Sequence, residues 1–439
     1  MRSVPHFALI AVLLTGCASS TSAPVTDDVT IDRIVAVSDG DHLASTYVDG
    51  TLADPDAGFR DQLTTVRVIN GRVETAHVDV PNSVTAAPEV LALSPDGRTA
   101  FVAERLAQRQ PGDSRADQLA AGRRLTAVDV ADLGAPTVRS SVTVAENPES
   151  IGMSPDGRRI AVVANTADAA VLDVVDWSDS GFGRVQRIDL ASIGITGTAQ
   201  LPRGGVLATN VHWHPSGRAI AINIDTQDRV ALFQVAENPD GTVALTPWGN
   251  VKTGPDPFVG RFTPDGRHYV TANWGRDLTT TVAAQRLPRG PSTLTVIRLA
   301  DIADRTGAHR VVASAESDKS SEGLAISPDG TLIATVNMRG TVFPPQSPLF
   351  DGEGSVSLLR LDVHTGNLTK IGDYPLTAVL PEGGTFDDTG RFFIATSFEG
   401  RGPGDGGPAI QIYRVDASTG LTPVQRVSLP HGVHHVVVG

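Results

Sequence analysis

The chain has 439 residues, of which 40% are hydrophobic and 19% charged, and its formal net charge is −13. These proportions are ordinary for a soluble globular protein with a large buried core, and the acidic balance argues against nucleic acid or an anionic lipid surface as a direct partner. A single cysteine excludes an internal disulfide and a cysteine-based metal site.

The beginning of the chain has the pattern of an export signal. Arg2 gives a short positive start, and Phe7–Leu14 is an apolar run too short to span a bilayer as a helix. Small residues then lead to the cysteine in Leu14-Thr-Gly-Cys17, a run that resembles a bacterial lipobox. That resemblance implies cleavage before Cys17 and lipidation of its thiol. The alternative is a signal peptide that happens to contain a cysteine.

The chain is therefore divided into three parts. Residues 1–16 are predicted to be a lipoprotein signal peptide, and residues 17–28 the lipidated cysteine with a flexible tether rich in Ser, Thr and Ala. Residues 29–439 form the folded part. The prediction is an exported protein that is anchored to the bacterial cell envelope through Cys17 alone.

A strand–turn–strand pattern recurs along the folded part. In Ile151–Asn165, two apolar runs flank the turn Ser154-Pro-Asp-Gly157. Proline presets φ, Asp bonds to its own backbone, and Gly adopts a positive φ without strain. Copies lie about 50 to 64 residues apart, a spacing that with this strand content is typical of a β-propeller. The other turns are Ser94-Pro-Asp-Gly97, His214-Pro-Ser-Gly217, Thr263-Pro-Asp-Gly266, Ser327-Pro-Asp-Gly330 and the degenerate Asp387-Asp-Thr-Gly390.

Each copy continues into two further strands, so four antiparallel strands make one blade. The six turns account for six blades, and the two ends of the chain must supply the seventh. We predict an all-β, seven-bladed propeller whose ring is closed by the C-terminal strand, which leaves no open edge. In that blade Val433–Val438 is innermost, followed by Ile31–Ser38, Gln62–Asn70 and Arg72–Val80. The alternative is an inner strand at Ile34–Ser38 with a spare strand at the C-terminus.

The long loops are predicted to lie on one face. Connections between the second and third strands of a blade share a face with the links between blades, and the long ones are of this kind. Long loops in a compact domain are usually functional, so these indicate a walled opening over the central channel. They are residues 39–61, 105–123, 276–290, 339–353 and 399–408.

Polar residues recur where the inner strands enter the channel from this face. Four carboxylates and one imidazole at one mouth would raise carboxyl pKa values or hold a divalent cation such as Ca²⁺, and no other cofactor is implied. The alternative is a solvated acidic rim without chemistry. The entry residues are Glu89, Glu149, Thr209, Phe258, Glu322, Glu382 and His431. Three positions further along each inner strand, most residues are small, as expected beside a crowded axis. The exceptions are His212, Arg261 and His434.

The repeats SPDGRRIAVVAN, TPDGRHYVTAN and SPDGTLIATVN, and the ending GVHHVVVG, resemble the lactonase-like, or YVTN-type, seven-bladed propellers, which include 6-phosphogluconolactonases. The resemblance implies hydrolysis or formation of a lactone, with His, Arg and Glu near the channel. The sugar-phosphate lactonases of this family are cytoplasmic, whereas this chain has a predicted export signal. The difference argues against a phosphorylated substrate. Residues that match in type and place are His212, Arg261, Glu322, Glu382 and His431.

Two functional hypotheses follow. In the first, a monomer hydrolyses a lactone or ester: a Glu or His activates water, Arg261 stabilises the oxyanion, His434 belongs to the catalytic set, and Glu89 and Glu149 bind substrate. In the second, a non-catalytic envelope propeller binds a protein or glycan through its long-loop face.

Overall fold

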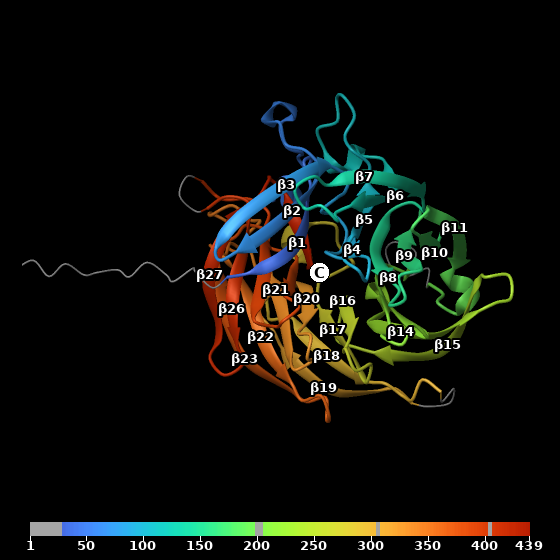
Figure 1. Cartoon of the computed structure of the whole chain (residues 1–439). Helices are drawn as coiled ribbons and strands as arrows, with labels where there is room; N and C mark the ends of the chain where they lie inside the picture. The colour runs from blue at the N-terminus through green and yellow to red at the C-terminus, as the bar shows by residue number, and fades with distance from the viewer. Residues whose placement is uncertain (1–28, 198–204, 304–307, 403–405) are drawn as a thin grey trace, which may run out of the picture.

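Seven four-stranded antiparallel sheets stand around a central axis, and the chain passes through them in order (Figure 1). The structure is a computed structural model that describes residues 29–197, 205–303, 308–402 and 406–439. The predicted signal peptide, the tether and Cys17 lie outside these ranges. The predicted fold class is confirmed.

The four strands of each blade run in sequence from the channel to the rim. From the innermost strand outward, blade 1 consists of β28 (Val433–Val438), β1 (Ile31–Ser38), β2 (Gln62–Ile69) and β3 (Arg72–Asp79). Blade 2 consists of β4 (Leu91–Leu93), β5 (Thr99–Leu106), β6 (Ala121–Asp129) and β7 (Thr137–Thr143). Blade 3 consists of β8 (Pro148–Met153), β9 (Arg159–Asn165), β10 (Ala170–Ser178) and β11 (Gly181–Asp189). Blade 4 consists of β12 (Ala208–Trp213), β13 (Ala219–Ile224), β14 (Arg229–Glu237) and β15 (Val243–Lys252).

The last three blades follow the same plan. Blade 5 consists of β16 (Pro257–Phe262), β17 (His268–Asn273), β18 (Thr293–Arg298) and β19 (Arg310–Glu316). Blade 6 consists of β20 (Ser321–Ile326), β21 (Leu332–Asn337), β22 (Gly354–Leu361) and β23 (Leu368–Leu376). Blade 7 consists of β24 (Gly384–Phe386), β25 (Phe392–Ser397), β26 (Ala409–Asp416) and β27 (Gly420–Ser428). Short helices in the connections include α1 (Thr46–Asp49), α2 (Ala283–Arg286) and the 3₁₀ turn η3 (Leu190–Ile193).

The ring is closed by the two ends of the chain. β28 pairs antiparallel with β1, so that Ala36 faces Val436 and Val35 faces Val437. Figure 1 shows the C-terminus at the centre of the ring. This pairing confirms the predicted closure and excludes the alternative with a spare C-terminal strand.

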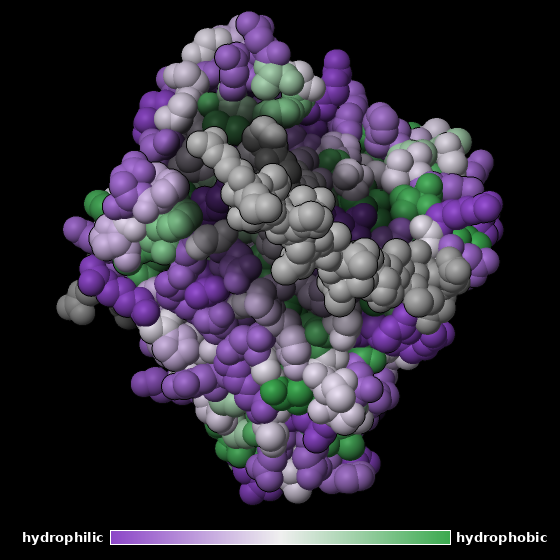
Figure 2. Space-filling model, turned by 90° about the vertical axis from the view of Figure 1, so that its left-hand side faces the viewer, coloured by the Kyte–Doolittle hydropathy of each residue, from purple (hydrophilic) through white to green (hydrophobic). Residues whose placement is uncertain are grey.

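The turns form as their residues dictate. In the turn before β9, Ser154 Oγ donates to Asp156 Oδ1 at 2.6 Å, the same oxygen accepts from Arg158 N at 3.1 Å, and Gly157 takes a φ of 71°. The second strands that follow are almost wholly buried between neighbouring blades. The side of the molecule in Figure 2 is mostly hydrophilic, with hydrophobic residues in small, separate patches. The core therefore lies between the blades, around the axis.

The long second-to-third-strand connections are present as predicted. They join β1 to β2, β5 to β6, β17 to β18, β21 to β22 and β25 to β26. The second of them spans residues 107–120, shorter than predicted, because β5 and β6 extend further. Within the described residues, no helix has the length and apolarity to cross a bilayer.

Removal of residues 433–439 tests the closure. Without β28, the hydrogen-bonding edge of β1 and the apolar side chains around it become exposed, and the loss is comparable to the whole stability of a domain, about 5–15 kcal/mol. We expect thermal unfolding followed by circular dichroism to lose its cooperative transition. A chain that lacks only Gly439, which follows β28, serves as the control. An unchanged melting temperature after removal of the whole strand would show that the ring does not depend on it.

Candidate functional site

A cavity of about 230 Å³, which we call the mouth cavity, opens on the long-loop face. Its wall combines loop 39–61, loop 274–292 and the entries to the inner strands of blades 5, 6 and 7. The side chains with chemical potential that line it are His42, Tyr47, Arg105, Trp274, Arg276, Arg286, Glu322 and Glu382.

β-Bulges aim the entry residues of four inner strands. The pairing of β20 with β21 skips Glu322, and the corresponding skips fall at Glu149, Thr209 and Phe258. A bulge inserts one unpaired residue and turns its side chain out of the regular alternation. This explains why residues three positions apart both reach the channel, although a regular strand alternates with a period of two.

Glu322 and Glu382 form a buried carboxyl pair. They are 2% and 3% exposed, and their carboxyl groups interact with each other. Burial raises the pKa of both carboxyl groups, and the negative charge of Glu322 raises that of Glu382 further, while Arg276 opposes the shift at Glu322. Two carboxylates in contact cannot both ionise at low cost, so the pair retains a proton near neutral pH. It therefore offers a neutral acid as a hydrogen-bond donor.

Loop 39–61 adds a histidine to the same cavity. His42 Nδ1 lies 2.9 Å from Asp39 Oδ2, and both residues are buried. The Asp39 carboxylate also accepts backbone N–H groups, including that of Val84 at 2.8 Å. Burial opposes the charge on His42, but attraction to Asp39 outweighs it and raises the pKa of His42.

The second nitrogen of this imidazole, Nε2, is buried and has no polar partner among the described residues. It lies on the other side of the His42 ring from Asp39. An Asp–His pair that leaves Nε2 unoccupied has the arrangement of a general base with its orienting carboxylate.

Two more unpartnered donors line the cavity within the part of the chain that the structure describes, Tyr47 Oη and Trp274 Nε1. The wall that carries them is fixed by Arg276, whose guanidinium lies 4.0 Å from the centre of the Trp274 ring. Arg276 is itself bound to Asp256 at 2.8 Å and to Asp225 at 2.9 Å. Because Asp256 and Asp225 both bind it, Arg276 positions the wall instead of binding an anion.

His434 lies behind the carboxyl pair. It is fully buried, its Nε2 lies 2.8 Å from Asn82 Oδ1, and its Nδ1 lies 4.0 Å from Glu382 Oε2. Burial lowers its pKa to about 4, so the imidazole is neutral. Its place beside Glu382 suits a residue that orients the pair.

Glu89, His212 and Arg261 line a different space, called the turn-face cavity, of about 560 Å³ beside the Ser-Pro-Asp-Gly turns. Arg261 Nη2 contacts Glu89 Oε1 at 2.6 Å, and its Nε donates to Leu324 O at 2.8 Å. Burial, and then Arg261, lower the pKa of His212 to about 3. The structure thus separates these three residues from Glu322 and Glu382, and the catalytic roles of all five stay predictions.

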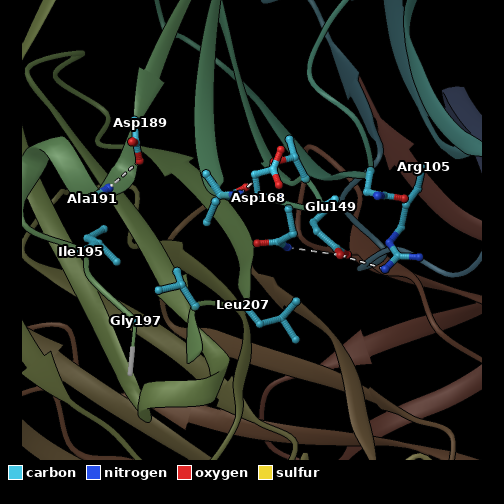
Figure 3. A pocket seen from close by; sticks show the side chains of 15 residues that line it. Arg105, Glu149, Asp168, Asp189, Ala191, Ile195, Gly197 and Leu207 are labelled. Atoms are coloured by element: carbon cyan, nitrogen blue, oxygen red, sulfur yellow. Dashed lines mark hydrogen bonds and ion pairs between the residues drawn. The ribbon is translucent and has the colours of Figure 1, made fainter. Parts of the chain in front are cut away.

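The other two predicted residues also lie apart. Glu149 pairs with Arg105 at 3.0 Å in a groove of about 580 Å³ (Figure 3), called the side groove. His431 stacks on Phe59 with ring centres 3.8 Å apart, and its Nε2 lies 2.8 Å from His42 O. His431 therefore supports the loop that carries His42.

The proposed calcium site does not fit this arrangement. Ca²⁺ takes six to eight oxygen ligands, whereas Glu89 and Glu149 are each paired with an arginine and only Glu322 and Glu382 meet. The residues that the structure describes contain no group of three or more His, Cys, Asp or Glu side chains arranged for a metal. The four carboxylates expected to converge do not.

Sequence reasoning missed Asp39 and His42. They lie outside the inner-strand register and in a loop without repeat partners, so no comparison between blades could find them. One signal was present: Asp39-Gly-Asp-His42 places an acid three residues before a histidine at the start of a loop predicted to wall the mouth.

No protein-family model and no curated protein matches the sequence. Solved structures do match the fold. The periplasmic gluconolactonase of Pseudomonas aeruginosa is 17% identical, with a TM-score of 0.63, over 92% of this chain and 99% of that one. A protein from Bacteroides fragilis described as a candidate 6-phosphogluconolactonase is 16% identical, with a TM-score of 0.64, over 95% of this chain and 100% of that one.

A third match, from Bacteroides uniformis and described in the same way, is 14% identical with a TM-score of 0.63, over 93% of this chain and 99% of that one. Likeness at such low identity speaks for the fold and not for the activity. The chain shares its fold with the lactonase-like seven-bladed propellers.

Proposed function

We propose that the mouth cavity hydrolyses a lactone or a similar ester. The observation that carries this proposal is that one small cavity holds both His42, with its free Nε2, and the proton-sharing pair Glu322–Glu382. Ester hydrolysis needs a base for water and a donor for the oxyanion. Both are supplied by this chain's own side chains.

In the first step, His42 Nε2 accepts a proton from a water molecule as the water oxygen bonds to the carbonyl carbon. Asp39, 2.9 Å from Nδ1, stabilises the imidazolium that forms. Buried as it is, this ion pair keeps its full electrostatic effect because little water screens it.

The carbonyl oxygen becomes an oxyanion and accepts hydrogen bonds from the proton of the Glu322–Glu382 pair and from Tyr47 or Trp274. When the tetrahedral intermediate collapses, the ring carbon–oxygen bond breaks. The leaving oxygen takes the proton from His42 Nε2, which restores the neutral imidazole. One water is consumed, and the product is a hydroxy acid.

The matched structures support the same substrate class, because one is named a gluconolactonase and two are described as candidate 6-phosphogluconolactonases. Arg276, already bound to two carboxylates, offers no free charge to a phosphate. We therefore favour an unphosphorylated lactone.

The variant His42→Gln tests the base. Loss of a positioned general base costs about 10²–10⁴-fold in rate, so kcat/KM for lactones should fall within that range. Because the buried Asp39 loses its partner, the melting temperature should fall as well, and rates are measured well below it. His77→Gln, on the exposed outer strand β3, is the matched control. Undiminished turnover in His42→Gln would remove His42 from the mechanism. A wild-type chain that turns over no lactone in a broad panel would favour the binding module.

The pH dependence tests the two titrating groups together. Because Asp39 raises the pKa of His42, the base becomes available only above the ordinary imidazole range, and kcat/KM should rise there. Because burial raises the carboxyl pKa values, the shared proton is lost only at alkaline pH, where kcat/KM should fall. Glu382→Gln leaves Glu322 as the single carboxyl group, without the second negative charge that makes loss of the last proton costly, so the alkaline limb should move to lower pH while the acidic limb stays. Rates are corrected for spontaneous hydrolysis, and an alkaline limb at the same pH in the variant contradicts the assignment.

We further propose that the protein works outside the cytoplasm, anchored by lipid on Cys17; the Pseudomonas aeruginosa match is likewise named periplasmic. The variant Cys17→Ser has no thiol to lipidate. It should therefore move from the membrane fraction to the soluble extracytoplasmic fraction and lose the metabolic labelling with palmitate that the wild-type chain shows. Labelling that persists in the variant would rule out this anchor.

A further inference from the structure

The side groove and the mouth cavity meet at one residue. Arg105, at the end of β5, lines both spaces. Its Nη2 contacts Glu149 Oε1 at 3.0 Å and its Nη1 donates to Thr85 Oγ1 at 3.1 Å, so the guanidinium is fixed between them. A molecule whose reacting end lies in the mouth cavity would reach the groove by passing Arg105.

The groove contains a buried carboxylate with an unused oxygen. The Glu149 side chain is only 4% exposed, and its contacts with Arg105 and with Asn165 Nδ2 both use Oε1. Figure 3 shows this carboxylate between Asp168 and Arg105. Oε2 takes part in neither contact, and a carboxylate oxygen accepts a hydrogen bond from any suitable donor. A ligand hydroxyl can provide that donor.

The charges of the groove select against anions. Asp168 and Asp189 add two exposed carboxylates at its rim, and the positive charge of Arg105 is already paired. A phosphate or carboxylate on the ligand would be repelled, whereas hydroxyl groups can donate to these acceptors.

The volumes of the two spaces also favour a ligand that is larger than one sugar ring. Small-molecule sites usually enclose about 300–1,000 Å³, and the mouth cavity alone, at about 230 Å³, is smaller than this. The side groove, which shares Arg105 with the mouth cavity, has a volume of about 580 Å³. A monosaccharide lactone would leave the groove unused.

We propose that the side groove binds a neutral, polyhydroxylated extension of the substrate, so that the preferred substrate is a lactone that carries a further sugar unit. This inference rests on the proposed lactone hydrolysis. It assigns substrate recognition to Glu149 and Asp168, outside the mouth cavity.

The test compares two lactones on the full chain: D-glucono-δ-lactone and maltobiono-δ-lactone, which adds one neutral glucose unit. Wild-type kcat/KM should be about tenfold higher for the larger lactone, mainly through KM. In Asp168→Asn and Glu149→Gln this preference should fall towards one. Asp179→Asn, in the β10–β11 hairpin at the opposite end of the same strands, is the matched control and should keep it. Equal kcat/KM values in the wild type, or a preference unchanged in both variants, would overturn the proposal.

Failure of lactone hydrolysis itself gives a separate result. If the wild-type chain turns over neither lactone, the groove is tested by calorimetric titration with maltobionate, the open acid, in parallel with maltose. Saturable binding of maltose that weakens in Asp168→Asn but not in Asp179→Asn supports the groove even then. Absence of binding by both sugars, or equal binding in both variants, refutes it.

Discussion

The pairing of β28 with β1 is the constraint on which both the ring and the site depend. A blade buries its faces only against its two neighbours, so an unclosed ring leaves two of them exposed. The same closure positions the candidate base. Asp39 directly follows β1, and its N–H donates to Gly432 O, just before β28. A side chain at Gly432 would collide with the backbone oxygen of Asp39, so this approach requires glycine there.

The site combines two kinds of positioning. Glu322 is held by a β-bulge in a paired inner strand, and Glu382 is held at the entry to the next blade, so the carboxyl pair belongs to the rigid part of the ring. His42 belongs to a loop, but the loop is fixed by Asp39 on one side and by His431 on the other. The rigidity that catalysis requires therefore does not depend on regular secondary structure at every residue.

The sequence predicted the structural features that repeat from blade to blade, and it missed those that occur only once. The turns, such as Ser154–Gly157, have local chemical causes and occur in each copy, so the blades and the closing strand could be derived. The entry register also predicted Glu322 and Glu382, because equivalent positions in a ring face one axis. It could not predict that Arg261 pairs with Glu89 in the turn-face cavity. Side-chain direction depends on the β-bulges, and the amino-acid composition does not reveal where these occur. His42 has no equivalent in other blades, and repeat comparison has no access to such a residue.

The electrostatics of the channel explain why a neutral substrate suits this site. Arg276 is bound by two aspartates, Arg105 by Glu149 and Arg261 by Glu89, so these three cations are each neutralised where they stand. Burying paired charges costs desolvation and leaves little net field for a ligand. Hydrogen-bonding groups are also present around the mouth: the proton of Glu322–Glu382, the Nε2 of His42, and the unused oxygen of Glu149. A ligand rich in hydroxyl groups, with one reactive carbonyl, matches these groups.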